Sequence, residues 1–166
     1  MNYQEGFLLD RITVRVGVAG IGQGSAAHMV AQALDHFLNK RGRVRVFRKE
    51  KDRYVVTEEP QDPEDQDVMV GVIDPLPSSL EKSADRILEL KSLNTQVIWL
   101  LNRKNAGVDL SGLYRFLGFH PDHIQEEVPY ETICRAEYGM YELCEMTVLE
   151  GIKELADRIE KDYGPR

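Results

Sequence analysis

The sequence predicts an α/β fold with three layers, in which a mostly parallel sheet has helices on both faces. Short apolar segments of strand length alternate along the chain with longer segments whose apolar residues recur every three or four positions. The segment 67–74 is almost wholly apolar between two aspartates, which is typical of a parallel strand buried on both faces. No linker or internal repeat interrupts residues 1–166, so a single domain is expected.

The predicted strands are runs rich in Val, Ile and Leu, bounded by glycine, proline or charged residues. The first run places Val14, Val16 and Val18 on one face and then becomes wholly apolar. The acidic stretch 58–67 contains two prolines and is expected to be an exposed loop. In chain order, the strands are expected at 12–19, 44–47, 54–57, 67–74, 95–101 and 123–128.

Each predicted helix has one apolar face, which we expect to pack against the sheet. Ser78 or Ser79 is expected to cap the second helix, and Gly118 is expected to end the third. Asp109 or Ser111 is the expected start of that third helix. The helices are expected at 25–40, 80–90, within 109–118, as a turn over 130–138, and at 146–162.

The composition is that of a globular protein, with 42% hydrophobic and 30% charged residues among 166. The net charge of −7 argues against nucleic acid or anionic lipid as a partner of the whole molecule. No apolar run is long enough for a membrane span, and the first residues do not resemble a secretory signal. We therefore expect a cytoplasmic protein in which Cys134 and Cys144 are free thiols.

A glycine-rich turn between the first strand and the first helix is the principal functional motif. Small residues allow a phosphate to approach the backbone, and the N–H groups at a helix start point toward an anion. The turn contains Gly20, Gly22, Gln23, Gly24 and Ser25. A phosphate loop that supports hydrolysis also has a lysine and a hydroxyl residue at its end, and this chain has Ala26 and Ala27 there.

The same glycines also fit the dinucleotide-binding pattern in the frame that runs from Gly22 through Gly24 to Ala27. That pattern requires an acidic residue at the end of the second strand, where this chain has Arg48, Lys49 and Glu50. A third interpretation is a tight turn that binds nothing. Strand order separates the first two interpretations: we expect one strand between the first strand and the strand before Asp74 in a phosphate-loop protein, and neighbouring first and second strands in a dinucleotide-binding one.

The pattern of segments resembles the MinD/ParA-like deviant Walker ATPases, which include the CpaE-like pilus-assembly proteins. The glycine loop, the helix after it and the stretch up to Phe47 are similar to the family's loop, first helix and second strand. Asp67-Val-Met-Val-Gly-Val-Ile-Asp74-Pro is similar to its strand with two aspartates, and Val97-Ile-Trp-Leu-Leu-Asn102 to its strand with a terminal asparagine. The resemblance covers roughly residues 12–130.

The resemblance implies a P-loop NTPase-like protein with a degenerate Walker A loop. The two lysine positions of the family fall at Ile21 and Ala26, and its hydroxyl falls at Ala27. By the same resemblance, Asp74 lies near the metal and attacking water, and Asn102 reads the adenine edge. We expect nucleotide binding without ATPase activity, with no catalytic residue and no metal ligand. The expected nucleotide-binding residues are Gly20, Gly22, Gln23, Gly24, Ser25, Asp74 and Asn102.

The expected role is that of a scaffold or regulatory protein in a positioning or pilus-type assembly, with a protein partner or self-association. ATP or ADP is the ligand on this interpretation, and NAD(P) on the dinucleotide one. A basic cluster over 40–53 either protects an edge strand or binds an acidic partner. His120 and His123 are expected to lie in a surface loop and not in a metal site. The acidic last helix predicts no membrane contact.

Overall fold

The computed structural model describes residues 13–22, 25–39, 53–76, 81–104, 109–129, 131 and 148–164, and only the backbone of 103 and 104. Within these ranges, strands and helices alternate in the manner that the sequence predicts. The elements are β1 (Val14–Ile21), α2 (Ala27–Leu38), β2 (Tyr54–Glu58), the short 3-10 helix η1 (Pro63–Asp65), β3 (Val68–Ile73), α4 (Ala84–Lys91), β4 (Gln96–Lys104), α5 (Leu110–Leu117), β5 (His123–Glu126) and α8 (Glu150–Tyr163).

The described strands form one sheet in the order β2-β1-β3-β4-β5, and every neighbouring pair is parallel. β1 and β3 are hydrogen-bonded neighbours, so the expectation of a strand between them is wrong for the described sheet. The strand beside β1 on its other side is the predicted third strand, since 44–47 lies outside the described residues. This doubly wound order has its switch point between β1 and β3, where ligands bind at the carboxyl ends of the strands.

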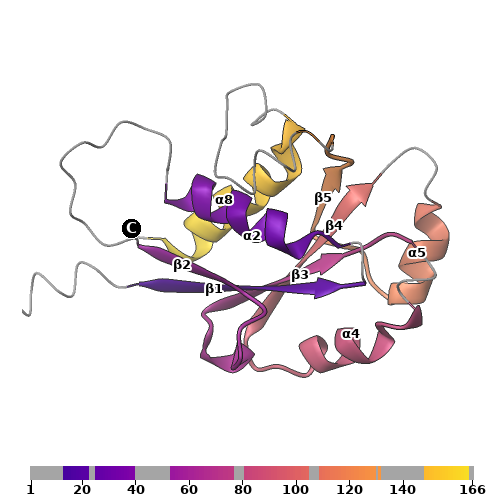
Figure 1. Ribbon diagram of the computed structural model, residues 1–166. Helices are drawn as coiled ribbons and strands as arrows, with labels where there is room; N and C mark the ends of the chain where they lie inside the picture. The colour runs from indigo at the N-terminus through magenta and orange to yellow at the C-terminus, as the bar shows by residue number, and fades with distance from the viewer. Residues whose placement is uncertain are drawn as a thin grey trace, which may run out of the picture.

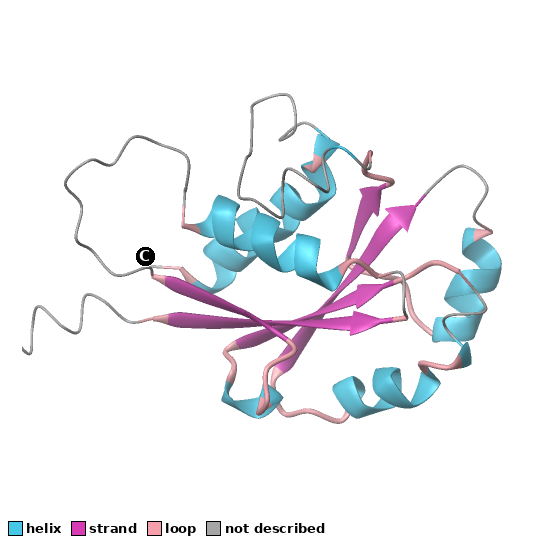
Figure 2. Cartoon of the chain, viewed as in Figure 1, coloured by secondary structure: helices cyan, strands magenta, loops and turns pink. Residues whose placement is uncertain are grey.

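Helices cover both faces of the sheet, which confirms the predicted α/β architecture. Figure 1 shows α2 and α8 on one side of the sheet and α4 and α5 on the other. Figure 2 shows the same three layers, with the parallel strands between the two pairs of helices. Alternate residues of one strand face opposite layers: Val16 and Val18 belong to the core under α2 and α8, whereas Ala19 and Ile21 belong to the core on the α4 and α5 side.

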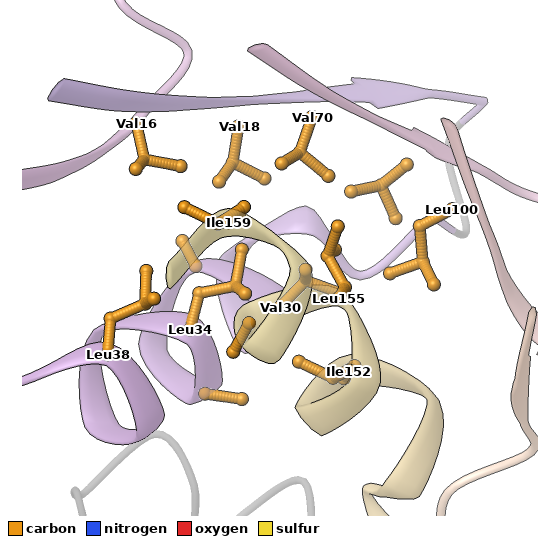
Figure 3. Close-up of a cluster of buried hydrophobic side chains, with 14 of the residues drawn as sticks. Val16, Val18, Val30, Leu34, Leu38, Val70, Leu100, Ile152, Leu155 and Ile159 are labelled. Atoms are coloured by element: carbon orange, nitrogen blue, oxygen red, sulfur yellow. The ribbon is translucent and has the colours of Figure 1, made fainter. Parts of the chain in front are cut away.

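The core under α2 and α8 is built from aliphatic side chains that meet across the two layers (Figure 3). Val30 and Leu34 of α2 lie beside the apolar face of α8 and point toward the sheet valines. β3 is buried along its whole length, as its apolar sequence predicts. The apolar residues of the helix predicted at 146–162 are buried, as expected of its inner face, namely Leu149, Ile152, Leu155, Ala156 and Ile159.

The element bounds differ from the predictions in ways that affect the candidate site. β1 continues to Ile21 and so includes Gly20, and β4 continues past Leu101 and so includes Asn102. α4 begins at Ala84 after Ser83, so the cap predicted at Ser78 or Ser79 is wrong for this helix. Asp109 and Gly118 bound α5 as predicted. Cys134, Cys144, the strand predicted at 44–47 and nearly all of the turn predicted at 130–138 lie outside the described residues.

Candidate functional site

The predicted site residues that the structure describes lie at the carboxyl ends of three adjacent strands. Gly20 lies in the last part of β1, Gly22 and Asp74 directly follow β1 and β3, and Asn102 lies in the last part of β4. Because β1, β3 and β4 are parallel neighbours, their carboxyl ends meet at one edge of the sheet. The sheet order thus brings Asp74 close to glycines that lie more than fifty positions earlier in the sequence.

At the first part of the glycine loop, the backbone of β1 lies close to the residues at the start of α2. A Cβ atom on Gly20 would lie 2.6 Å from the Ser25 hydroxyl oxygen and 3.2 Å from Ala27 Cβ, so a larger residue would have to displace the Ser25 side chain. Gly22 has φ 93°, in the left-handed region that glycine adopts without strain. Gln23 and Gly24 lie outside the described residues. The glycines at 20 and 22 therefore meet definite steric requirements of this turn.

Asn102 connects β4 to the glycine loop. Its side chain is fully buried, and Asn102 Nδ2 donates a hydrogen bond of 2.7 Å to the carbonyl oxygen of Ser25. Ser25 is itself buried, so the amide satisfies a carbonyl that water does not reach. The observed contact of Asn102 is therefore with the loop backbone, and its position within β4 differs from the turn-forming role that asparagine often has after a strand.

Asp74 connects β3 to β1 and then shapes the loop that follows. Its N–H donates to the carbonyl oxygen of Ile21 at 2.9 Å, which extends the parallel ladder to the end of β1. Its Oδ1 accepts a hydrogen bond of 3.1 Å from the N–H of Leu76, so the carboxylate caps the turn after β3. Asp74 is only 3% exposed. The side chain thus lies beside the glycine loop with an evident structural role.

The start of α2 is a suitable place for an anion. Ala26, the residue before the helix, has φ 56° and ψ 41°, and its own side chain cannot cap the helix. The first turn also contains no acidic residue. The first N–H groups of a helix have no partner within the helix, and the helix dipole makes this end positive. A phosphate at the loop would therefore receive hydrogen bonds from the backbone without competition from a side-chain cap.

Two charged residues near the loop were not predicted as site residues. Glu59, the residue after β2, accepts a hydrogen bond of 2.7 Å at Oε1 from the N–H of Gly20. Its other oxygen, Oε2, lies 2.6 Å from the guanidinium of Arg86 on α4. Neither residue lies in a recognisable sequence motif. The contacts of Glu59 with Gly20 and with Arg86 arise from the tertiary fold. The positive φ of Glu59 also could not be predicted from the sequence.

The histidines of the described residues do not form a metal site. His28, near the start of α2, pairs with Glu58 of β2 at 2.7 Å through Nδ1. This pair helps to line a groove of about 330 Å³ between α2 and β2. Across the described ranges, no cluster of three or more His, Cys, Asp or Glu side chains is placed to hold a metal ion. In those same ranges no helix is long and apolar enough to cross a membrane.

His123 makes stability depend on pH. Burial lowers the pKa of His123 below its ordinary value of 6.5, and Arg158 lowers it further, against the opposing effects of Asp122 and Glu154. The unfolded chain therefore binds a proton at a pH where the folded protein does not, so the free energy of unfolding should decrease as the pH falls below about 6.5. Urea unfolding between pH 7.5 and 5 measures this decrease, which His123→Gln should reduce.

His120→Gln is the matched control for this prediction, because His120 is an exposed histidine in the loop just before β5. The control variant should keep the pH dependence of the wild type. Equal pH dependence in the wild type and in His123→Gln would show that another group is responsible.

Similarity to known proteins is found among solved structures. No protein-family model matches the chain, and no curated protein matches its sequence. One similar solved structure is that of a protein described as a plasmid partition protein of Borrelia burgdorferi B31, bound to AMPPNP. It has 10% sequence identity with this chain and a TM-score of 0.46, over 92% of this chain and 89% of that one. The fold described above rests on the strands and helices of this chain alone.

Proposed function

We propose that this protein is a P-loop NTPase-like protein that binds a nucleotide at its glycine loop without hydrolysing it. The observation that carries the proposal is the connection of the loop to two neighbouring strands. Asn102 Nδ2 binds the Ser25 carbonyl, and the Asp74 N–H binds the Ile21 carbonyl, so both sides of the loop are fixed to the sheet. Phosphate binding requires backbone N–H groups that converge on the anion, and fixing both ends of the loop favours such an arrangement.

The proposed lack of hydrolysis follows from the side chains around the loop. Lysine and hydroxyl side chains stabilise the transferring phosphoryl group and hold magnesium in active P-loop enzymes. This chain has Ile21, Ala26 and Ala27 at the corresponding positions of the resemblance. Asp74 remains, but its Oδ1 is engaged by the Leu76 N–H. We therefore assign Asp74 and Asn102 to holding the loop in place, and the phosphate contacts to the backbone from Gly20 to Ser25.

A protein that binds a nucleotide without hydrolysing it would act by binding another protein or a second copy of itself. We propose that it is a cytoplasmic scaffold or regulatory protein of a positioning or pilus-type assembly, with a protein partner or a second copy as its target. Support for this role comes from the resemblance of the loop and of the strands ending at Asp74 and Asn102 to the MinD/ParA-like proteins. Sedimentation velocity with and without ADP measures whether the nucleotide changes self-association.

Thermal unfolding with a panel of ligands tests the binding. ATP or ADP should raise the melting temperature, since a ligand at 100 times its Kd stabilises the folded state by about 2.7 kcal/mol. Gly22→Val should abolish this increase, because valine is strained at φ 93° and would displace the loop. The panel contains ATP, ADP, GTP, NAD and NADP, each with and without magnesium.

Gly118→Val is the matched control, because Gly118 also has a positive φ, of 77°, but lies at the end of α5. It should lower the melting temperature without ligand and keep the ligand-dependent increase. An increase with NAD or NADP alone would replace the proposed function with dinucleotide binding. No increase with any nucleotide at millimolar concentration would refute binding, and a magnesium-dependent ATPase rate lost in Asp74→Ala would refute the absence of hydrolysis.

A further inference from the structure

A carboxylate of the protein itself, that of Glu59, lies at the base of the glycine loop. The Glu59 carboxylate accepts the Gly20 N–H at 2.7 Å through Oε1 and contacts the Arg86 guanidinium at 2.6 Å through Oε2. One carboxylate is thus held between a backbone N–H of the strand that leads into the loop and a cation of α4. A backbone N–H together with a guanidinium is also a common combination of donors for a phosphate group.

The backbone of Glu59 is arranged so that its side chain reaches this place. Glu59 has φ 46°, a conformation that is unfavourable for a residue with a long side chain. Its N–H donates to the carbonyl oxygen of Val18 at 2.7 Å, which fixes the residue beside β1 just after β2 ends. From there the carboxylate returns to Gly20, two residues further along β1. Strained residues that the surrounding structure holds in place are often part of a functional site.

Arg86 also contacts a second carboxylate. Its other terminal nitrogen lies 3.0 Å from Glu89 Oε1, one turn further along α4. The Arg86 side chain is 28% exposed, whereas Glu59 is 47% and Glu89 is 58% exposed. The cation is therefore the most enclosed member of the three, and the two carboxylates are the more solvent-accessible ones. The Glu59 carboxylate can move into solvent while the more enclosed Arg86 side chain keeps its position on α4.

We propose that the Gly20 N–H and Arg86 form a phosphate-binding subsite, which the Glu59 carboxylate occupies until a phosphate group displaces it. This inference rests on the proposed function and deepens it. The loop lacks lysine at Ile21 and Ala26, so it has no cation of its own for a phosphate. Arg86 supplies that charge from α4, on the opposite side of the sheet from α2. Glu59 keeps the affinity low in the resting protein, because it competes for both donors.

Isothermal titration with inorganic pyrophosphate and with ADP, at one ionic strength and without magnesium, tests this inference. Glu59→Gln removes the competing charge and should tighten the binding of both probes by about tenfold, equivalent to about 1.4 kcal/mol. Glu59→Gly should have at least the same effect and should fold well, since glycine suits φ 46°. Arg86→Met in the Glu59→Gln background should reverse the gain.

Glu89→Gln is the matched control, because Glu89 also pairs with Arg86, whereas within the described residues the side chain that accepts from the Gly20 N–H is that of Glu59. It removes the same charge near Arg86 and should change the affinity by less than about twofold. Equal gains in Glu59→Gln and Glu89→Gln would reduce the effect to general electrostatics and overturn the subsite. A gain in Glu59→Gln that survives Arg86→Met would do the same.

The two probes separate the sources of the phosphate, and the wild type separates this inference from the proposed function. Tighter binding of pyrophosphate and ADP alike indicates a subsite for the phosphate group itself. Binding of ADP by the wild type with no change in Glu59→Gln would leave the proposed function intact and overturn the inference. Absence of binding by the wild type with clear binding by Glu59→Gln would support the inference and contradict the proposed nucleotide-bound role of the wild-type protein.

Discussion

Gly151→Ala is expected to destabilise the protein by about 3 kcal/mol or more, at the upper end of what overpacking costs. Gly151 lies in the first turn of α8, where the helix passes directly over the backbone of β5. A Cβ atom there would lie 2.7 Å from Gln125 Cα and closer still to the Ile124 carbonyl oxygen. Both are backbone atoms of a strand in the sheet, so neither can move aside without displacing β5. Urea unfolding at neutral pH measures the loss.

Gly112→Ala is the matched control, since it makes the same substitution in α5. A Cβ atom at this position would lie 3.0 Å from Asp109 Oδ2, an oxygen of a capping side chain that can move. Because alanine favours a helix over glycine by up to about 1 kcal/mol, this variant should be close to neutral or slightly more stable. A similar loss of stability in both variants would mean that the contact between α8 and β5 is not the cause.

Asn102→Ala is expected to cost about 2 kcal/mol and to weaken nucleotide binding. The amide of Asn102 is the donor to the buried carbonyl of Ser25, and alanine would leave that carbonyl without this partner. An unsatisfied buried polar group costs about 1–3 kcal/mol. The same hydrogen bond holds the glycine loop against β4, so its loss should also increase the Kd for ADP. Urea unfolding and isothermal titration of the same variant measure the two effects.

Asn94→Ala is the matched control, because Asn94 is an exposed asparagine just before the same strand. Exposed substitutions away from special features usually change stability by less than about 0.5 kcal/mol, and this one should leave the Kd unchanged. If Asn102→Ala lowers stability and the ADP affinity is that of the wild type, then Asn102 stabilises the fold without positioning the loop for ligand. The positioning role in the proposed function would then be wrong.

The layers of the fold could be predicted because the apolar pattern within each segment indicates whether it is a strand or a helix and which face is buried. The apolar run from Val68 to Ile73 indicates a buried parallel strand, and the spacing of Ile152, Leu155 and Ile159 indicates the inner face of a helix. The neighbours of β1 could not be predicted in the same way. The order of parallel strands depends on which crossovers bury the most apolar surface, and no single segment carries that information. The expectation of a strand between β1 and β3 was wrong for this reason.

The sequence predicted the motif residues of the candidate site but not the charged residues beside them. Gly20 and Asp74 end strands, and the carboxyl ends of parallel strands meet, so their proximity follows from the fold class. Glu59 and Arg86 lie in an acidic loop and on a helix surface, where charged residues usually face solvent. The contact of Glu59 with Gly20 depends on the left-handed backbone of Glu59, and its pair with Arg86 depends on the position of α4. Tertiary structure alone brings these charges to the loop.

The central position of β1 has a consequence for how the chain folds. Val14 pairs with Tyr54 on one side, and Val16 pairs with Val68 on the other. The first strand of the chain therefore has no hydrogen-bonded neighbour in the sheet until much later residues have been synthesised. Parallel sheets with such distant pairings fold slowly, because loop closure precedes the gain from the contacts. Because the hydrogen bonds that fix the two ends of the glycine loop come from Asp74 and Asn102, we expect these ends to be fixed only after β3 and β4 have joined the sheet.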